Sequence, residues 1–180
     1  MEEMERTVVS EFDPSNFLTS FWGTWKGVIT NPSLFFRQMP REGGFLPPVL
    51  FMLVCLGADG LLKAIFGGGI RGFFSAFVGT TLITFLIAAV MLLFSTQLFP
   101  GRGSYEGSFR VLAYTNAVSV LGWIPVIGVL AALYGLYIAA LGVMEVHTLD
   151  RGKAGVVIII TALVMIVLSL LLGGGMFFGR

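Results

Sequence analysis

Charged residues are scarce in this chain of 180 residues. Asp, Glu, Lys and Arg make up 12% of it, whereas 56% of its residues are hydrophobic. Globular chains carry about 25% charged residues, so these long and almost uncharged runs exclude a soluble domain. The net charge of +1 also excludes the broad basic field that would attract nucleic acid. The composition predicts an all-α, polytopic membrane protein that contacts the lipid bilayer and no nucleic acid.

Disulfides, a signal peptide and enzyme motifs are also lacking. The single cysteine, Cys55, lies in an apolar run and cannot form an internal disulfide, so we expect a small buried side chain there. The start, Met-Glu-Glu-Met-Glu-Arg, is acidic where a secretory signal is basic, so the first span is expected to act as its own signal. His-Glu-x-x-His, Gly-x-Ser-x-Gly and Gly-Lys-[Ser/Thr] do not occur. We therefore expect no enzymatic activity and no cofactor.

Residues 105–154 organise the rest of the prediction. One apolar helix stops at Trp123-Ile124-Pro125, a second runs to Met144, and a charged exit extends from Glu145 to Lys153. Two or three residues around Pro125 separate the helices, which predicts a tight antiparallel hairpin. Both helices are too apolar for water, so the hairpin is expected to lie in a membrane.

Five membrane-spanning helices are predicted within residues 45–178. Their ranges are 45–66, 73–98, 109–123, 124–146 and 154–178. The third is roughly 22 Å long at 1.5 Å per residue, and falls short of a hydrocarbon core of roughly 30 Å. It is therefore expected either to begin earlier, at Glu106 with Arg110 snorkelling, or to be partly shielded by neighbouring helices.

Two amphipathic helices are predicted within residues 15–44, after a flexible acidic tail over residues 1–14. Apolar residues of the first helix recur at spacings of three and four: Phe17, Leu18, Phe21, Trp22, Trp25, Val28 and Ile29. Such a broad aromatic face is typical of a helix lying along the bilayer surface. The alternative is that this helix packs against the chain's own spans. Asn31-Pro32 is expected to begin the second, shorter helix.

The distribution of Lys and Arg predicts the orientation of the spans. Eight lie on one predicted side: Arg6, Lys26, Arg37, Arg41, Arg102, Arg110, Arg151 and Lys153. Three lie on the other: Lys63, Arg71 and Arg180. This asymmetry places the N-terminus in the cytoplasm and the C-terminus outside, in the inner membrane if the cell is prokaryotic.

Small residues form a seam along the fourth predicted span. They are Gly128, Ala132, Gly135, Ala139 and Gly142. In lipid, small side chains mark where another helix approaches closely. We expect another helix of the same chain to pack there. The alternative is an interface with a second copy or with another membrane protein.

The candidate functional positions are polar residues within or beside the spans. They are Asp59, Lys63, Tyr105, Glu106, Arg110, Tyr114, Asn116, Ser119, Glu145, His147 and Asp150. In the third span, polar side chains are expected to form interhelical hydrogen bonds or to line a polar cavity. Asp59 and Lys63 can pair at their i, i+4 spacing, as an outer-leaflet anchor, an ion or proton relay, or a lipid headgroup site.

Glu145, His147 and Asp150 suggest a metal hypothesis, because three ligand types stand close together. This histidine is the only one in the chain, however, and the spacing matches no established zinc motif. We therefore predict no metal site. Polar contacts that fix the loop, or a surface for a partner, explain the pattern better.

A pattern of short motifs resembles a known family. One motif stands before the first span: Asn31-Pro32-Ser33-x-Phe35-Phe36. Further along the chain come, in order, Tyr105-Glu106-Gly107-Ser108-Phe109-Arg110-Val111-Leu112-Ala113-Tyr114, Pro125, Glu145-x-His147 and Lys153-Ala154. This order resembles the Yip family, the Ypt/Rab-interacting multi-span membrane proteins, especially its prokaryotic branch. The resemblance implies five spans with the N-terminus inside. Eukaryotic members are associated with Rab GTPases and membrane shape, but their Asp-Leu-Tyr-Gly-Pro motif is absent here, so GTPase binding is not carried over.

Two functions follow as hypotheses. The first is a non-enzymatic membrane scaffold, assembly partner or bilayer-shaping unit, since the aromatic helix and the short third span would wedge or thin one leaflet. The second is a small transporter or channel that uses the polar face of the third span with Asp59 and Lys63.

Overall fold

The computed structural model describes residues 11–171, in which the backbone forms helices and connecting turns but no strand. The α-helices are α1 (Phe17–Thr30), α2 (Pro32–Gln38), α3 (Leu46–Lys63), α4 (Gly69–Gln97), α5 (Tyr105–Thr115), α6 (Pro125–His147) and α7 (Arg151–Leu171). Short helices η1 (Pro14–Asn16) and η3 (Asn116–Leu121) are of the 3-10 type, and η2 (Ala64–Gly68) is a π-helix. The all-α prediction is confirmed.

Four helices within residues 11–171 are long and apolar enough to cross a membrane. They cover Leu46–Phe66, Phe77–Gln97, Val126–His147 and Arg151–Leu168. They correspond to the predicted spans 45–66, 73–98, 124–146 and 154–178, although α4 begins earlier, at Gly69, and α7 at Arg151. The last residues of the fifth predicted span lie outside the described residues.

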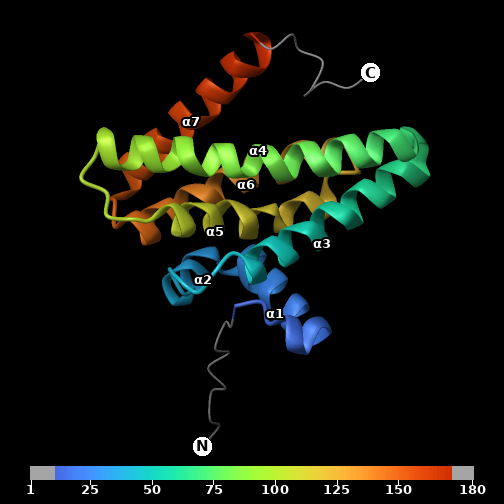
Figure 1. The fold of residues 1–180 in the computed structure, drawn as a ribbon, viewed down its shortest axis with the longest axis horizontal. Helices are drawn as coiled ribbons and strands as arrows, with labels where there is room; N and C mark the ends of the chain where they lie inside the picture. Colours follow the sequence, from blue (N-terminus) through green and yellow to red (C-terminus); the bar gives the residue numbers. More distant parts are fainter. Residues whose placement is uncertain (1–10, 172–180) are drawn as a thin grey trace, which may run out of the picture.

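The third predicted span, 109–123, is not a continuous apolar helix. The α-helical part covers Tyr105–Thr115, and the chain then tightens into η3. Its start lies upstream of Phe109 because the Ser104 hydroxyl accepts a hydrogen bond from Gly107 N and caps the helix there. Together α5 and η3 extend roughly 28 Å. They run beside α4 and α6 (Figure 1), and end where Trp123 stacks on Phe66 at 5.0 Å, beside the α3–α4 turn.

The core is built around α5 rather than around the more apolar helices. Phe109, Val111, Ala113 and Tyr114 are fully buried. The neighbouring helices each leave an apolar side exposed, as Leu82 of α4 and Leu133 of α6 show. This distribution suits a membrane, where the polar helix gains from being enclosed and the apolar helices can face lipid.

The small-residue seam of α6 packs against helices of the same chain. A methyl group on Gly142 would lie 2.5 Å from Val111 and 3.2 Å from Phe36, and one on Gly135 would lie 3.1 Å from Val118. Glycine therefore lets α5, η3 and α2 approach α6 closely. Ala139 is buried too, while Ala132 is exposed, and Gly128 lies at the turn, against the backbone of Gly122.

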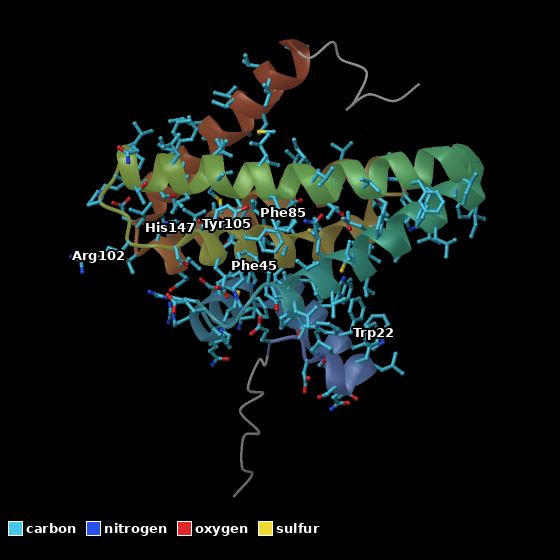
Figure 2. The ribbon with its side chains drawn as sticks, viewed as in Figure 1. Trp22, Phe45, Phe85, Arg102, Tyr105 and His147 are labelled. Atoms are coloured by element: carbon cyan, nitrogen blue, oxygen red, sulfur yellow. The ribbon has the colours of Figure 1, made fainter. Side chains whose placement is uncertain are left out.

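Helices α1 and α2 pack on one side of the bundle (Figure 1). The buried side of α1 consists of Ser20, Thr24, Gly27 and Val28. The aromatic face is divided, since Phe21 and Trp25 are half-buried whereas Trp22 points away from the bundle (Figure 2) and is 61% exposed. The alternative considered for this helix, packing against the chain's own spans, is thus what the structure shows. Its position relative to a bilayer surface stays a prediction.

Candidate functional site

Arg110 lies at the centre of a buried polar cluster in α5. The side chain is fully buried, and each of its nitrogens donates a hydrogen bond. The Nε atom donates to Glu106 Oε1 at 3.0 Å, Nη1 to Glu11 Oε1, and Nη2 to the Gly44 carbonyl at 2.7 Å. A buried charge is tolerated only when it is paired and hydrogen-bonded, and this arrangement meets both conditions.

Further hydrogen bonds hold the two carboxylates in place. The Tyr114 hydroxyl donates to Glu11 Oε1 at 2.7 Å, and Gly44 N donates to Glu106 Oε1 at 2.8 Å. The network therefore joins the N-terminal segment, the loop before α3 and α5. Glu11 falls in the predicted flexible tail, and no local pattern marks it as the partner of a residue 99 positions away.

The loop at Gly43 and Gly44 needs glycine for this approach. Their φ angles are +140° and +91°, which side chains disfavour. A methyl group on Gly43 would also lie 3.2 Å from Arg110 Nη2. The two glycines thus allow the backbone to come close enough for the Gly44 carbonyl to accept from the guanidinium.

Aromatic rings enclose the cluster. Tyr114 packs edge-on against Phe35 at 5.0 Å and, in a tilted arrangement, against Phe51 at 5.2 Å. Phe12 is 2% exposed and lies 6.1 Å from Phe51. By excluding water, these rings strengthen the charge–charge interactions that they surround.

A second aromatic group lies next to the cluster, where α3, α4 and α5 meet (Figure 2). Phe85 stacks on Phe109 at 4.4 Å, and Phe45 lies 5.3 Å from Phe109. The Tyr105 hydroxyl donates to the Phe85 carbonyl at 3.1 Å.

His147, at the end of α6, pairs with a serine of α5. Ser108 Oγ lies 2.9 Å from Nε2 of His147 and also donates to the Ser104 carbonyl at 2.9 Å. Because a hydroxyl has one proton, Nε2 is the donor in the first contact. The other nitrogen, Nδ1, is buried without a partner in the described part of the chain. No carboxylate there orients the imidazole as a catalytic triad requires.

Glu145 and Asp150, the other two residues of the metal hypothesis, form contacts with other partners. Glu145 Oε1 accepts from Arg37 Nη2 at 3.1 Å. Asp150 accepts from Lys153 N at 2.9 Å and caps α7, and this hydrogen bond holds its pKa below the ordinary value. The three side chains make three separate contacts. Within residues 11–171 no group of three His, Cys, Asp or Glu residues could hold a metal ion.

Basic residues contact the end of the bundle at which α6 ends. Arg41 Nη2 donates to the Glu145 carbonyl at 3.0 Å, and Arg102 N donates to the His147 carbonyl at 3.2 Å. Both satisfy carbonyls at the C-terminal end of α6, and the Arg41 guanidinium also places positive charge there, which the helix dipole favours. The Arg102 side chain is exposed at this end (Figure 2).

Asp59 and Lys63 form a separate pair near the end of α3. The pair predicted from their spacing is present, at 2.7 Å between Nζ and Oδ2. Asp59 Oδ1 and Ser119 Oγ are both buried without a partner among residues 11–171. Asp59 lies against the η3–α6 turn, since a methyl group on Gly122 would be 3.1 Å from Oδ1.

Asn116 is the first residue of η3. Its Nδ2 donates to the Leu112 carbonyl at 2.9 Å, and the neighbouring Thr115 hydroxyl donates to the Val111 carbonyl at 2.7 Å. Both side chains therefore bond to their own helix rather than to another one. This differs from the expected interhelical bonds. Both residues line a cavity, but its wall is mostly aliphatic rather than polar as the alternative expected.

Comparison with known proteins identifies the family. No curated protein and no solved structure matches the chain significantly. The model of the Yip1 domain family matches residues 26–173, which include α2 to α7 and most of the polar residues described above. That match confirms the resemblance seen in the sequence, and the chain belongs to the Yip1 domain family of multi-pass membrane proteins.

Proposed function

We propose that the chain is a non-enzymatic membrane scaffold that shapes the bilayer. One observation carries this proposal: a helix with an exposed aromatic and apolar side is fixed to one side of a transmembrane bundle. A fixed helix can widen one leaflet only, whereas a loosely tethered helix would adapt to the lipid around it.

Four contacts support the rigid attachment of α1 and α2. The Arg110 cluster holds the segment before α1 at Glu11. Trp25 Nε1 donates to the Ala117 carbonyl at 2.9 Å, and the Tyr134 hydroxyl donates to the Ile29 carbonyl at 2.7 Å. Arg37 of α2 pairs with Glu145. These contacts reach α5, η3 and α6, so both helices are expected to move with the bundle.

The outer side of α1 is suited to lipid. Phe17, Leu18 and Trp22 are 43%, 71% and 61% exposed. Large exposed apolar side chains grouped on one helix mark an interaction surface, and a helix with Trp and Phe on its free side favours the boundary between headgroups and acyl chains. These side chains would act as a wedge, because they occupy volume in one leaflet and not in the other.

The proposed topology has five crossings, with the N-terminus in the cytoplasm. Exposed Arg37, Arg41, Arg102 and Arg151 lie at one end of the bundle, as the positive-inside rule favours. We propose that α5 and η3 make the remaining crossing. Their buried polar residues avoid lipid because α3, α4 and α6 surround them.

The transporter alternative has less support. The Asp59–Lys63 pair lies near the end of α3, whereas Gly44 of the Arg110 cluster precedes the start of α3. Phe51 of α3 and Phe109 of α5 are fully buried aromatic residues. A pathway for ions would need polar side chains along its length.

Reconstitution tests the scaffold function. The purified chain is placed in phosphatidylcholine vesicles, and vesicle diameter is measured by electron cryomicroscopy at matched protein-to-lipid ratios. Wild type is expected to make vesicles smaller or tubular. Changing Leu18 and Trp22 together to Ala should abolish this effect, because it removes the wedge and leaves the attachments intact.

The matched control changes Leu133 and Tyr137 of α6 to Ala. They have the same i, i+4 spacing and are 59% and 56% exposed, but lie in a transmembrane helix. Vesicles with this control should resemble wild type. Equal loss of curvature in both variants, or vesicles of unchanged shape with wild type, would refute bilayer shaping.

A further inference from the structure

A cavity of about 470 Å³ lies between α4, α5, η3, α6 and α7. Thr80, Thr84, Thr115, Asn116 and Thr161 supply polar groups to its wall, which is otherwise almost entirely aliphatic. In size it falls within the range of pockets that bind small molecules, about 300–1,000 Å³. It is separate from the Arg110 cluster.

The walls of the cavity belong to the apolar stretches of the bundle. Its lining on α4, α6 and α7 falls within Phe77–Gln97, Val126–His147 and Arg151–Leu168, which are the membrane-spanning segments. An occupant therefore enters from the lipid phase. None of the lining side chains, all from the described part of the chain, carries a charge. An ionised headgroup or a metal ion would be left unpaired there, so the occupant is neutral.

One buried hydroxyl in the wall lacks a hydrogen-bond partner in the described part of the chain. The hydroxyls of Thr84 and Thr115 donate to the Thr80 and Val111 carbonyls, each at 2.7 Å. Thr161 is 4% exposed, and its Oγ1 is buried without a hydrogen-bond partner among residues 11–171. Burying a hydroxyl without a hydrogen-bond partner costs free energy, and a purely aliphatic occupant would leave the Thr161 hydroxyl without one. The occupant is thus expected to carry an uncharged oxygen.

The volume sets the size of the occupant. An engineered apolar cavity of about 150 Å³ takes up one benzene molecule, so this cavity has room for roughly three molecules of that size. A single long hydrocarbon chain fits this space, whereas the two chains of a phospholipid together do not.

We propose that this cavity binds a neutral single-chain lipid whose hydroxyl or carbonyl oxygen forms a hydrogen bond with Thr161. The recognition is independent of bilayer shaping, because none of the lining residues belongs to α1 or α2.

Competitive photolabelling tests the proposal on the full chain in phosphatidylcholine nanodiscs. The probe is hexadecanol with a diazirine in mid-chain, and mass spectrometry locates the labelled peptides. Label is expected on α4, α6 and α7 around the cavity. Unlabelled hexadecanol should compete about tenfold better than hexadecane, which lacks the oxygen. Ionised palmitate should compete no better than hexadecane.

Substitutions connect the label to the cavity. Thr161→Val keeps the side-chain shape and should remove the advantage of hexadecanol over hexadecane, while Thr161→Ser should retain it. Thr81→Val is the matched control, because the Thr81 hydroxyl donates to the Phe77 carbonyl at 2.8 Å and lies outside the cavity. Ala132→Phe places a ring into the open side of the cavity, and should prevent labelling altogether.

Three outcomes would overturn the proposal. Equal competition by hexadecane and hexadecanol would mean that any acyl chain fills the space. Label outside the cavity, or label that survives Ala132→Phe, would place the binding elsewhere. Crosslinks between two copies through the lining of the cavity would show that a second chain fills it.

Discussion

Replacing Arg110 by Met should detach the N-terminal segment from the bundle. The guanidinium is fully buried and pairs with Glu11 and Glu106, whose side chains are 16% and 20% exposed. Removing it leaves two carboxylates together in a mostly buried site. Breaking a buried ion pair in this way costs about 3–5 kcal/mol. Each 1.4 kcal/mol is tenfold in an equilibrium constant, so the loss changes the folding equilibrium by a factor of roughly 100 to 4,000.

Two measurements check this expectation. The free energy of unfolding, from titration of detergent-solubilised protein with dodecyl sulfate, should fall by about 3 kcal/mol or more. Hydrogen exchange of residues 13–20 should become faster, because Asp13 N and Ser20 Oγ are bonded at 3.1 Å only while this segment is folded back on α1.

Arg37→Met is the matched control. Arg37 also pairs with a glutamate, Glu145, but its side chain is 68% exposed. An exposed pair of this kind contributes about 0–1 kcal/mol. If Arg110→Met cost no more than Arg37→Met, the charge network would not be what holds the segment. The double variant with Glu11→Met should lose less than the sum of the two single variants, because the second change removes a charge that is already unpaired.

Two further results are expected. Gly142→Ala should cost about 1–3 kcal/mol in unfolding free energy, since the added methyl would lie 2.5 Å from Val111 and 3.2 Å from Phe36. Gly155→Ala should be close to neutral, because no described atom lies within 4 Å of the added methyl. Equal effects would disprove the close approach of α5 to α6. Reporter tags on the two ends of the chain should appear in opposite compartments if α5 and η3 cross the membrane, and tags in the same compartment would exclude five crossings.

Much of the fold could be predicted because membrane helices follow from local composition. The apolar runs predicted four spans that the structure contains, with small shifts at their ends. Pro125 marked the turn of the hairpin, and Asn31-Pro32 the start of α2, where the Asn31 side chain accepts from Leu34 N. The pair of Asp59 and Lys63 was predictable as well, since four residues along a helix bring side chains together.

The sequence by itself determined that the chain is a bundle of apolar helices, because the hydrophobic effect acts on runs of neighbouring residues. Only the tertiary structure decided which polar groups meet. Glu11 reaches Arg110 and Ser108 reaches His147 across large separations in sequence, while the Thr161 hydroxyl finds no partner within residues 11–171 and lies beside a cavity. The physical reason is that a buried polar group must find its partner wherever packing places one, and packing depends on the whole bundle rather than on local spacing.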